Sequence, residues 1–252
     1  MTLRVLHTTG RPLETGLELD IEHEATPGRL RDLYAPPAAT WTRLNLITAV
    51  SGDAAGSDGT SETLSNPTDR TILAAIRAVA DGVVVGAASV RAEGYRVPKT
   101  SRLVVVTSSG DLSGHRMAPE AAERVVVVCP EAAVAEVRRT LGGEVARAAT
   151  VLTCADESRR LEPAAVLDRL HAHGLLSLVC EGGPSLAGQF LHDGLVDELC
   201  LSTSPIVIGS GLPVFGRERF DPSRLTLSQL LMDEQSALYA RWLVEDGPAT
   251  RR

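Results

Sequence analysis

The chain has 252 residues, of which 44% are hydrophobic, and this length allows one large domain or two small ones with a substantial core. No apolar run approaches the roughly 20 residues that a membrane-spanning helix needs, and the N-terminus carries no signal-peptide core, so we expect a cytoplasmic protein with no membrane partner. The net charge of −7 and a single lysine, Lys99, argue against a nucleic-acid partner, because phosphate backbones require clustered basic residues.

Strands and helices are predicted to alternate along the chain after an irregular, acidic, proline-punctuated arm at residues 1–38. Apolar runs bounded by turn residues predict strands at 41–50, 82–86, 102–107, 124–129, 150–152 and 175–180. Helical spacing of apolar residues and N-terminal prolines predict helices at 65–80, from 89 onward, at 132–141 and at 163–173.

The strand composition predicts an α/β fold. The valine runs at 83–85 and 125–128 are typical of parallel strands that are covered on both faces of a sheet. Residues 225–232 and 237–244, separated by Asp-Glu-Gln-Ser, predict an antiparallel hairpin at the end of the sheet. We therefore expect a mixed, mostly parallel sheet flanked by helices, with a C-terminal antiparallel hairpin and a short tail at 247–252.

Residues 178–191, LVCEGGPSLAGQFL, combine a buried strand, a glycine pair and a helix start. Gly182 and Gly183 let the backbone approach a ligand closely, and Pro184 suits the first turn of a helix. Backbone N–H groups and the positive end of the helix then favour an anion such as a phosphate. An ordinary strand-to-helix turn is the competing interpretation of the glycine pair.

Two further segments accompany this turn, namely 65–93 (SNPTDRTILAAIRAVADGVVVGAASVRAE) and 191–211 (LHDGLVDELCLSTSPIVIGSG). Together the three segments resemble the pyrimidine reductase of riboflavin biosynthesis, the C-terminal reductase domain of a bifunctional deaminase-reductase, which belongs to the dihydrofolate-reductase-like family. The resemblance extends from about Trp41 to Trp242. It implies an NADPH-dependent reductase domain at residues 39–246 and a homodimer, since the family is commonly dimeric.

The resemblance assigns residues that contact the NADPH cofactor. Ser89 and Glu93 match a hydroxyl and an acid beside the cofactor; a helix cap and a solvated helix end are the alternatives. The full set of expected cofactor-binding residues is Gly86, Ser89, Glu93, Thr107, Ser108, Gly182, Gly183, Pro184, Ser185 and Leu186.

On the substrate side, the resemblance places Arg77 against a sugar phosphate, although a surface salt bridge is the competing account. Glu181 would accept hydrogen bonds from ribose hydroxyls or a ring amine. Either Arg96 or Lys99 could also reach a phosphate. The expected substrate-binding residues are Asn45, Ser51, Ser61, Arg77 and Glu181.

One departure from the family pattern concerns the loop after the first strand. The family usually carries Ser-x-Asp-Gly there, whereas this chain has Ser51 where that Asp stands and Asp53 two positions later. If the family Asp orders the substrate or relays a proton, its loss changes the substrate or slows the reaction. The zinc-deaminase signature H-x-E…P-C-x-x-C is also missing, and the four scattered cysteines are expected to be core residues with no metal bound.

By resemblance, the reaction is hydride transfer from NADPH to the ribose C1′ of 5-amino-6-(5-phosphoribosylamino)uracil or a related phosphorylated pyrimidine. No nucleophile is required, so no catalytic side chain is assigned. Two alternatives stay open: a dihydrofolate or pterin reductase of the same fold, and a non-catalytic homologue that binds NADPH.

Overall fold

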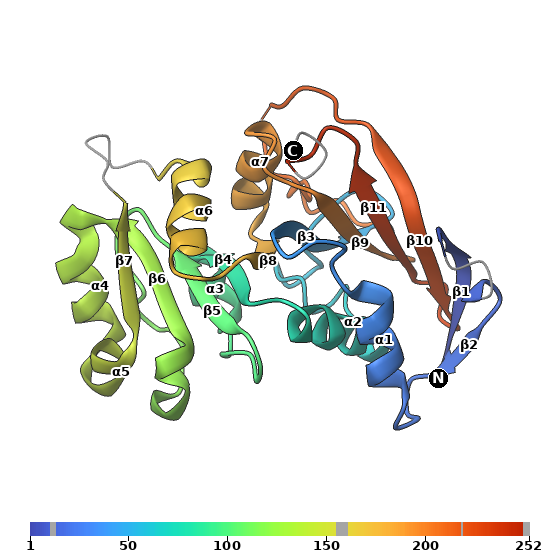
Figure 1. Cartoon of the computed structure of the whole chain (residues 1–252), viewed down its shortest axis with the longest axis horizontal. Coiled ribbons are helices and arrows are strands. Elements are labelled where there is room, and N and C mark those ends of the chain that lie inside the picture. Colours follow the sequence, from blue (N-terminus) through green and yellow to red (C-terminus); the bar gives the residue numbers. More distant parts are fainter. Residues whose placement is uncertain (11–13, 155–160, 218, 249–252) are drawn as a thin grey trace.

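The structure is a computed structural model that describes residues 1–10, 14–154, 161–217 and 219–248. Its strands form one mixed sheet in the order β2-β1-β10-β11-β9-β3-β8-β4-β5-β6-β7 (Figure 1). The strands are β1 (Thr2–Thr8), β2 (Glu18–Asp20), β3 (Trp41–Ala49), β4 (Gly82–Gly86), β5 (Arg102–Val106), β6 (Val125–Pro130), β7 (Thr150–Cys154), β8 (Ser177–Gly182), β9 (Glu198–Ser204), β10 (Leu225–Asp233) and β11 (Leu238–Val244). The seven strands from β9 to β7 run parallel, and the remaining pairings are antiparallel.

Helices cover both faces of the sheet. They are α1 (Thr26–Tyr34), α2 (Pro67–Ala78), α3 (Ala87–Glu93), α4 (Val134–Leu141), α5 (Gly143–Ala148), α6 (Pro163–Ala172) and α7 (Pro184–His192), with short 3-10 helices at Pro119–Arg124 and Glu131–Ala133. Leu30 of α1, Ile76 of α2 and Val137 of α4 belong to the core on one face. Leu170 of α6 and Phe190 of α7 belong to the core on the other face. The predicted fold class is therefore confirmed, and so is the burial of both valine runs.

Helix α2 begins at Pro67, two residues after the predicted start at residue 65. The side chain of Asn66 accepts a hydrogen bond from the backbone N–H of Asp69, and Pro67 occupies the first turn. Ile72 and Ile76 point into the core, so the opposite side of the helix is left for other contacts.

The prediction of an irregular arm at residues 1–38 is wrong for most of that segment. Strand β1 pairs with β10, β2 pairs with β1, and α1 packs its Leu30 and Leu33 into the core. Leu3 and Val5 alternate with polar residues, which is the period of a half-buried strand. Because β1 continues the sheet beyond β10, the predicted position of the hairpin at the sheet's end is wrong as well.

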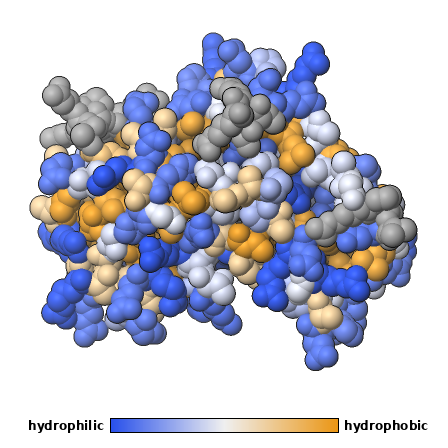
Figure 2. Space-filling view, viewed as in Figure 1, coloured by the Kyte–Doolittle hydropathy of each residue, from blue (hydrophilic) through white to orange (hydrophobic). Residues whose placement is uncertain are grey.

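On the face seen in Figure 2, apolar patches are small and lie among hydrophilic side chains. Within the described residues, no helix has both the length and the apolar character needed to cross a membrane. The described part of the proposed tail is limited to residues 247 and 248, and residues 249–252 lie outside the described residues.

Candidate functional site

The turns after β4 and β8 meet at the carboxyl ends of these strands, where open α/β sheets bind ligands. Gly182 has a φ of 87°, a left-handed conformation that favours glycine, and the Gly182–Gly183 peptide is cis. A Cβ on Gly183 would lie 2.9 Å from Oγ of Ser89, and one on Gly86 would lie 3.8 Å from the carbonyl oxygen of Gly182. The missing Cβ of Gly183 therefore allows the turn after β8 to lie close to Ser89, whereas a Cβ on Gly86 would be at ordinary contact distance.

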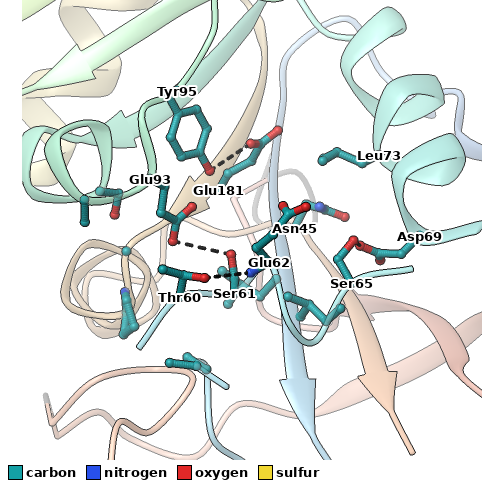
Figure 3. A pocket seen from close by; sticks show the side chains of 18 of the residues that line it. Asn45, Thr60, Ser61, Glu62, Ser65, Asp69, Leu73, Glu93, Tyr95 and Glu181 are labelled. Atoms are coloured by element: carbon teal, nitrogen blue, oxygen red, sulfur yellow. Dashed lines mark hydrogen bonds between the residues drawn. The ribbon is translucent and has the colours of Figure 1, made fainter. Parts of the chain in front are cut away.

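A cavity of about 620 Å³ adjoins these turns (Figure 3). Helix α2 and the segment around α3 form two of its sides; β3, the loop at 54–65, the turn after β8 and residues 212 and 214 also line it. The residues that carry its chemistry are Asn45, Asp69, Arg77, Glu93, Tyr95 and Glu181.

Glu181 occupies a bulge near the end of β8. Strand β4 pairs Val84 with Cys180 and Val85 with Gly182, so Glu181 has no opposite residue on β4. A bulge turns a strand and redirects a side chain, and such irregularities are common beside active sites. The carboxylate of Glu181 lies within the cavity wall beside Tyr95 (Figure 3).

Arg77, Glu181 and Tyr95 form a connected group. Arg77 donates from Nε and Nη2 to the two carboxylate oxygens of Glu181 at 2.7 and 2.6 Å, and the Tyr95 hydroxyl donates to Oε2 at 3.1 Å. The Arg77 guanidinium also lies 5.8 Å from the centre of the Tyr95 ring. Burial opposes the charge of Arg77, but the hydrogen bonds and charge of Glu181 outweigh it and raise the pKa of Arg77. Arg77 therefore holds a carboxylate in this structure.

A second acidic group faces α3. Oγ of Ser61 lies 3.4 Å from Oε1 of Glu93, at the outer limit of a hydrogen bond. Desolvation raises the pKa of the Glu93 carboxyl, and the nearby carboxylates of Glu181 and Glu62 raise it further. Glu93 is consequently easier to protonate than an ordinary surface glutamate.

Four arginines line the cavity. Arg70 pairs with Glu62 at 2.5 Å and Arg77 pairs with Glu181. Arg96 and Arg116 form no ion pair within the described ranges, and the side chain of Arg116 packs over Gly94 at the end of α3. An anionic ligand therefore finds its free positive charge on the α3 side of the cavity.

The sequence profile of the RibD C-terminal domain family matches residues 40–238. The chain belongs to this family. It is 33% identical over 177 residues to the riboflavin biosynthesis protein RibD of Mycobacterium tuberculosis, a match that covers 69% of this chain and 43% of that relative. It is 31% identical over 179 residues to the 2,5-diamino-6-ribosylamino-4(3H)-pyrimidinone 5′-phosphate reductase of Methanothermobacter thermautotrophicus, covering 66% of this chain and 78% of the relative.

Solved structures agree with this assignment to the RibD C-terminal domain family. A pyrimidine reductase-like protein from Corynebacterium diphtheriae superimposes with a TM-score of 0.73 at 25% identity, covering 85% of this chain and 98% of that one. The deaminase/5-amino-6-(5-phosphoribosylamino)uracil reductase of Thermotoga maritima has a TM-score of 0.64 at 19% identity, covering 82% of this chain and 57% of that one, and shares the fold. The matched region spans less than half of the mycobacterial RibD.

The cavity of this RibD-family chain brings together many of the predicted residues. Those that line it are Asn45, Ser61, Arg77, Ser89, Glu93, Glu181, Gly183 and Pro184. Gly86 and Gly182 adjoin it through the meeting of the two turns. Thr107, Ser108, Ser185 and Leu186 do not line it, and the hydroxyl of Thr107 accepts a hydrogen bond from the backbone N–H of Gly110 at 3.0 Å.

Ser51 lies outside the cavity lining. Its Oγ is 2.6 Å from the carbonyl oxygen of Ile208 and 2.9 Å from Oδ2 of Asp53. Asp53 also accepts hydrogen bonds from the Ser210 hydroxyl at 2.7 Å and from the N–H of Gly211 at 3.0 Å; the serine hydroxyls lower its pKa. The loop that departs from the family pattern thus ties residues 51–53 to residues 208–211, and a direct contact of Ser51 with substrate stays a prediction.

Several lining residues were not predicted from the sequence, among them Asp69, Leu73, Tyr95 and Arg116. Asp69, Leu73 and Arg77 are spaced by four residues, so one side of α2 could have been identified from Arg77. No comparable pattern marks Tyr95 or Arg116, which lie in irregular segments. Among the described residues no cluster of three or more His, Cys, Asp or Glu side chains is arranged for a metal ion.

Proposed function

We propose that this chain is an NADPH-dependent reductase that transfers a hydride to the ribose C1′ of a phosphorylated ribosylaminopyrimidine. One observation carries the proposal: the Gly183–Pro184 turn and the group of Arg77, Glu181 and Tyr95 share a single cavity of about 620 Å³. A cofactor over the turn and a substrate in the cavity would thus lie in contact. Membership of the RibD C-terminal domain family supports the reaction type.

The cofactor end is the turn before α7. Gly183 and Ser185 offer backbone N–H groups, and α7 offers its positive end, to an anion; the missing Cβ of Gly183 leaves the close approach that a dinucleotide requires. When bound, NADPH supplies the hydride. We propose NADPH over NADH because the exposed hydroxyl of Ser108, which follows β5, is available to a 2′-phosphate.

The substrate end lies between α2 and α3. Arg96 and Arg116 suit a 5′-phosphate because neither is neutralised by a carboxylate within the described residues. Arg77 and Tyr95 fix both oxygens of Glu181, so this carboxylate can orient ribose hydroxyls without moving. Glu93, whose raised pKa favours protonation, is suited to hold the proton that must accompany the hydride.

The decisive experiment follows NADPH oxidation with three candidate reactants and a buffer blank in parallel. The reactants are 5-amino-6-(5-phosphoribosylamino)uracil, its 2-amino counterpart 2,5-diamino-6-ribosylamino-4(3H)-pyrimidinone 5′-phosphate, and dihydrofolate. Turnover of either ribosylaminopyrimidine, faster with NADPH than with NADH, is the expected result. Turnover of dihydrofolate alone would assign a pterin reductase, and NADPH binding without any turnover would assign a non-catalytic homologue.

We also propose that the protein acts in the cytoplasm as a homodimer, with one NADPH site in each subunit. The partly exposed apolar face of β9, β10 and β11 supports the dimer.

A further inference from the structure

Helix α2 presents three side chains to the cavity at intervals of four residues. Asp69, Leu73 and Arg77 all line it, and eight residues of helix span about 12 Å. A carboxylate therefore stands at one end of this row, an apolar side chain in the middle and a paired guanidinium at the other end. Figure 3 shows Asp69 and Ser65 on the opposite side of the cavity from Glu93 and Tyr95.

Asp69 is held in place by a hydroxyl group. The hydroxyl of Ser65 donates to Oδ2 at 2.8 Å. A carboxylate has about four acceptor positions, so one hydroxyl donor leaves capacity for a ligand. Asp69 forms no ion pair with another described residue, and its neighbour Arg70 is paired with Glu62.

Burial makes it energetically unfavourable for the carboxylate oxygens of Asp69 to lack hydrogen-bond donors. Desolvation raises the pKa of this carboxyl, and the hydroxyls of Ser202 and Ser65 and the charge of Arg70 oppose that rise. The N-terminus of α2 does not need this side chain as a cap, because Asn66 already accepts from the Asp69 N–H. A partly desolvated carboxylate that faces a cavity is stabilised by a ligand that donates hydrogen bonds to it.

The orientation of the proposed substrate follows from the charges. Free positive charge lies on the α3 side, at Arg96 and Arg116, and this side attracts the phosphate. The ribose then lies along Glu181, and the pyrimidine ring reaches the α2 side, where Leu73 offers an apolar contact. Asn45, at the centre of Figure 3, can donate or accept and so suits either form of the ring.

The two candidate rings differ at position 2, where one carries an amino group and the other a carbonyl oxygen. An amino group donates to a carboxylate, whereas a carbonyl oxygen only accepts and leaves the carboxylate unsatisfied. We propose that Asp69 recognises position 2 of the ring and makes this chain selective for the 2-amino pyrimidinone over the uracil. This inference rests on the proposed reductase function and names the ring form that it uses.

The test compares kcat/KM for the two ribosylaminopyrimidine phosphates in the wild type and in Asp69→Asn. The wild type is expected to prefer the 2-amino ring by about tenfold or more. Asp69→Asn is expected to lose that preference, because the new amide can donate to the 2-oxo group. Ser65→Ala keeps the carboxylate but removes one donor that orients it, so it should reduce the preference in the same direction without abolishing turnover.

Glu136→Gln is the matched control, because Glu136 is also an acid in the first turn of a helix but lies on α4. It should leave the preference unchanged. A wild type that turns over both rings equally, or an Asp69→Asn variant that keeps the preference, would overturn the role of Asp69 and leave the reductase function intact. Absence of turnover with both rings would instead contradict the proposed function, and the selectivity with it. If Asp69→Asn does not fold, Ser65→Ala tests the proposal instead: a reduced preference for the 2-amino ring supports the role of Asp69, and an unchanged preference overturns it.

Discussion

Arg77 and Glu181 lie 104 residues apart in the sequence, and their side chains form a two-point ion pair inside the cavity. The side chain of Glu181 is 4% exposed and that of Arg77 is 25% exposed. Both residues were predicted to bind substrate independently, Arg77 through the phosphate. Their pairing makes them one unit, in which Arg77 positions the carboxylate and Glu181 occupies the arginine donors that a phosphate would need.

Arg77→Ala is expected to destabilise the fold and to reduce kcat. The change leaves a nearly buried carboxylate without its cation, which costs about 2 to 4 kcal/mol of unfolding free energy. Urea unfolding measures this loss of stability. Arg77→Lys keeps the charge but not the two-point geometry, so its unfolding free energy should lie between those of the wild type and Arg77→Ala. If Arg77→Ala keeps wild-type stability and only raises KM for the phosphorylated substrate, Arg77 is a phosphate ligand after all.

The phosphate site is expected to depend on Arg96 and Arg116. Each change to Ala should raise KM for a phosphorylated substrate by about tenfold or more, the effect of losing one charge-assisted hydrogen bond. The dephosphorylated substrate should show no such change. Arg139→Ala removes an arginine that pairs with Glu136 on α4 and serves as the control. Equal effects on both substrates would exclude a phosphate contact.

Gly183→Val is expected to abolish NADPH binding without unfolding the chain. The φ of Gly183 is −54°, which any residue adopts, but the added side chain would enter the space beside Ser89 and the turn. Calorimetry measures the affinity, and circular dichroism checks the fold. Gly28→Val on α1, outside the cavity, should bind NADPH normally. Undiminished affinity in Gly183→Val would move the cofactor to another site.

The parallel strands β4, β5 and β6 were predictable because they are short, largely apolar and bounded by turn residues, and β4 was placed correctly to the residue. The parallel strand β9 was not predicted, because its apolar residues are mixed with polar ones. The turn at Gly182 and Gly183 could also be predicted from the sequence, since glycine pairs mark turns. Strand β1 was missed because its alternating pattern is short, and its partner β10 lies more than 200 residues away. The Arg77–Glu181 pair and the cavity role of Asp69 depend on which elements pack together, which local sequence does not encode.

A buried ion network at the start of β3, which includes Trp41 and Arg43, predicts how stability depends on pH. Glu198 is fully buried and accepts from Arg43 at 2.7 Å, Arg241 at 2.8 Å and the Trp41 indole at 2.9 Å. Burial alone would raise the pKa of Glu198, but the two arginines outweigh burial and lower it to about 2. The folded-state pKa thus lies below the ordinary value of 4.5, and the carboxylate stabilises the fold at neutral pH.

Glu198→Gln is expected to lower the unfolding free energy by about 3 to 5 kcal/mol at neutral pH, because it leaves the buried Arg43 and the partly buried Arg241 without their anion. The difference from the wild type should persist down to about pH 4.5 and shrink as the pH falls toward 2, where the wild-type carboxylate is protonated. Glu18→Gln, which breaks an exposed pair with Arg4, should cost less than about 1 kcal/mol. A difference that does not vary with pH would show that the pKa of Glu198 is the same in the folded and unfolded states, and that the two arginines do not lower it.

One face of the antiparallel half of the sheet bears on assembly. Leu201, Ala240 and Leu230 are paired across β9, β11 and β10, and Trp242 of β11 is paired with Leu227 of β10. Directly paired residues share a face, and these five side chains are only partly buried. The hairpin was predicted to lie at the end of the sheet, which would leave a strand edge free. Strand β1 covers that edge, so the dimer proposal rests on the face alone.

We therefore expect a homodimer in which this face meets its copy, because a two-fold contact is the commonest way to bury such a surface. Light scattering at micromolar concentration should give twice the chain mass of 26.7 kDa. Trp242→Glu should give the monomer mass, since it places a charge where the contact is desolvated. Leu176→Glu changes a leucine outside this face that is 36% exposed and should leave the dimer intact. A wild type of monomer mass would refute the dimer, whereas a dimeric Trp242→Glu variant would place its interface elsewhere on the molecule.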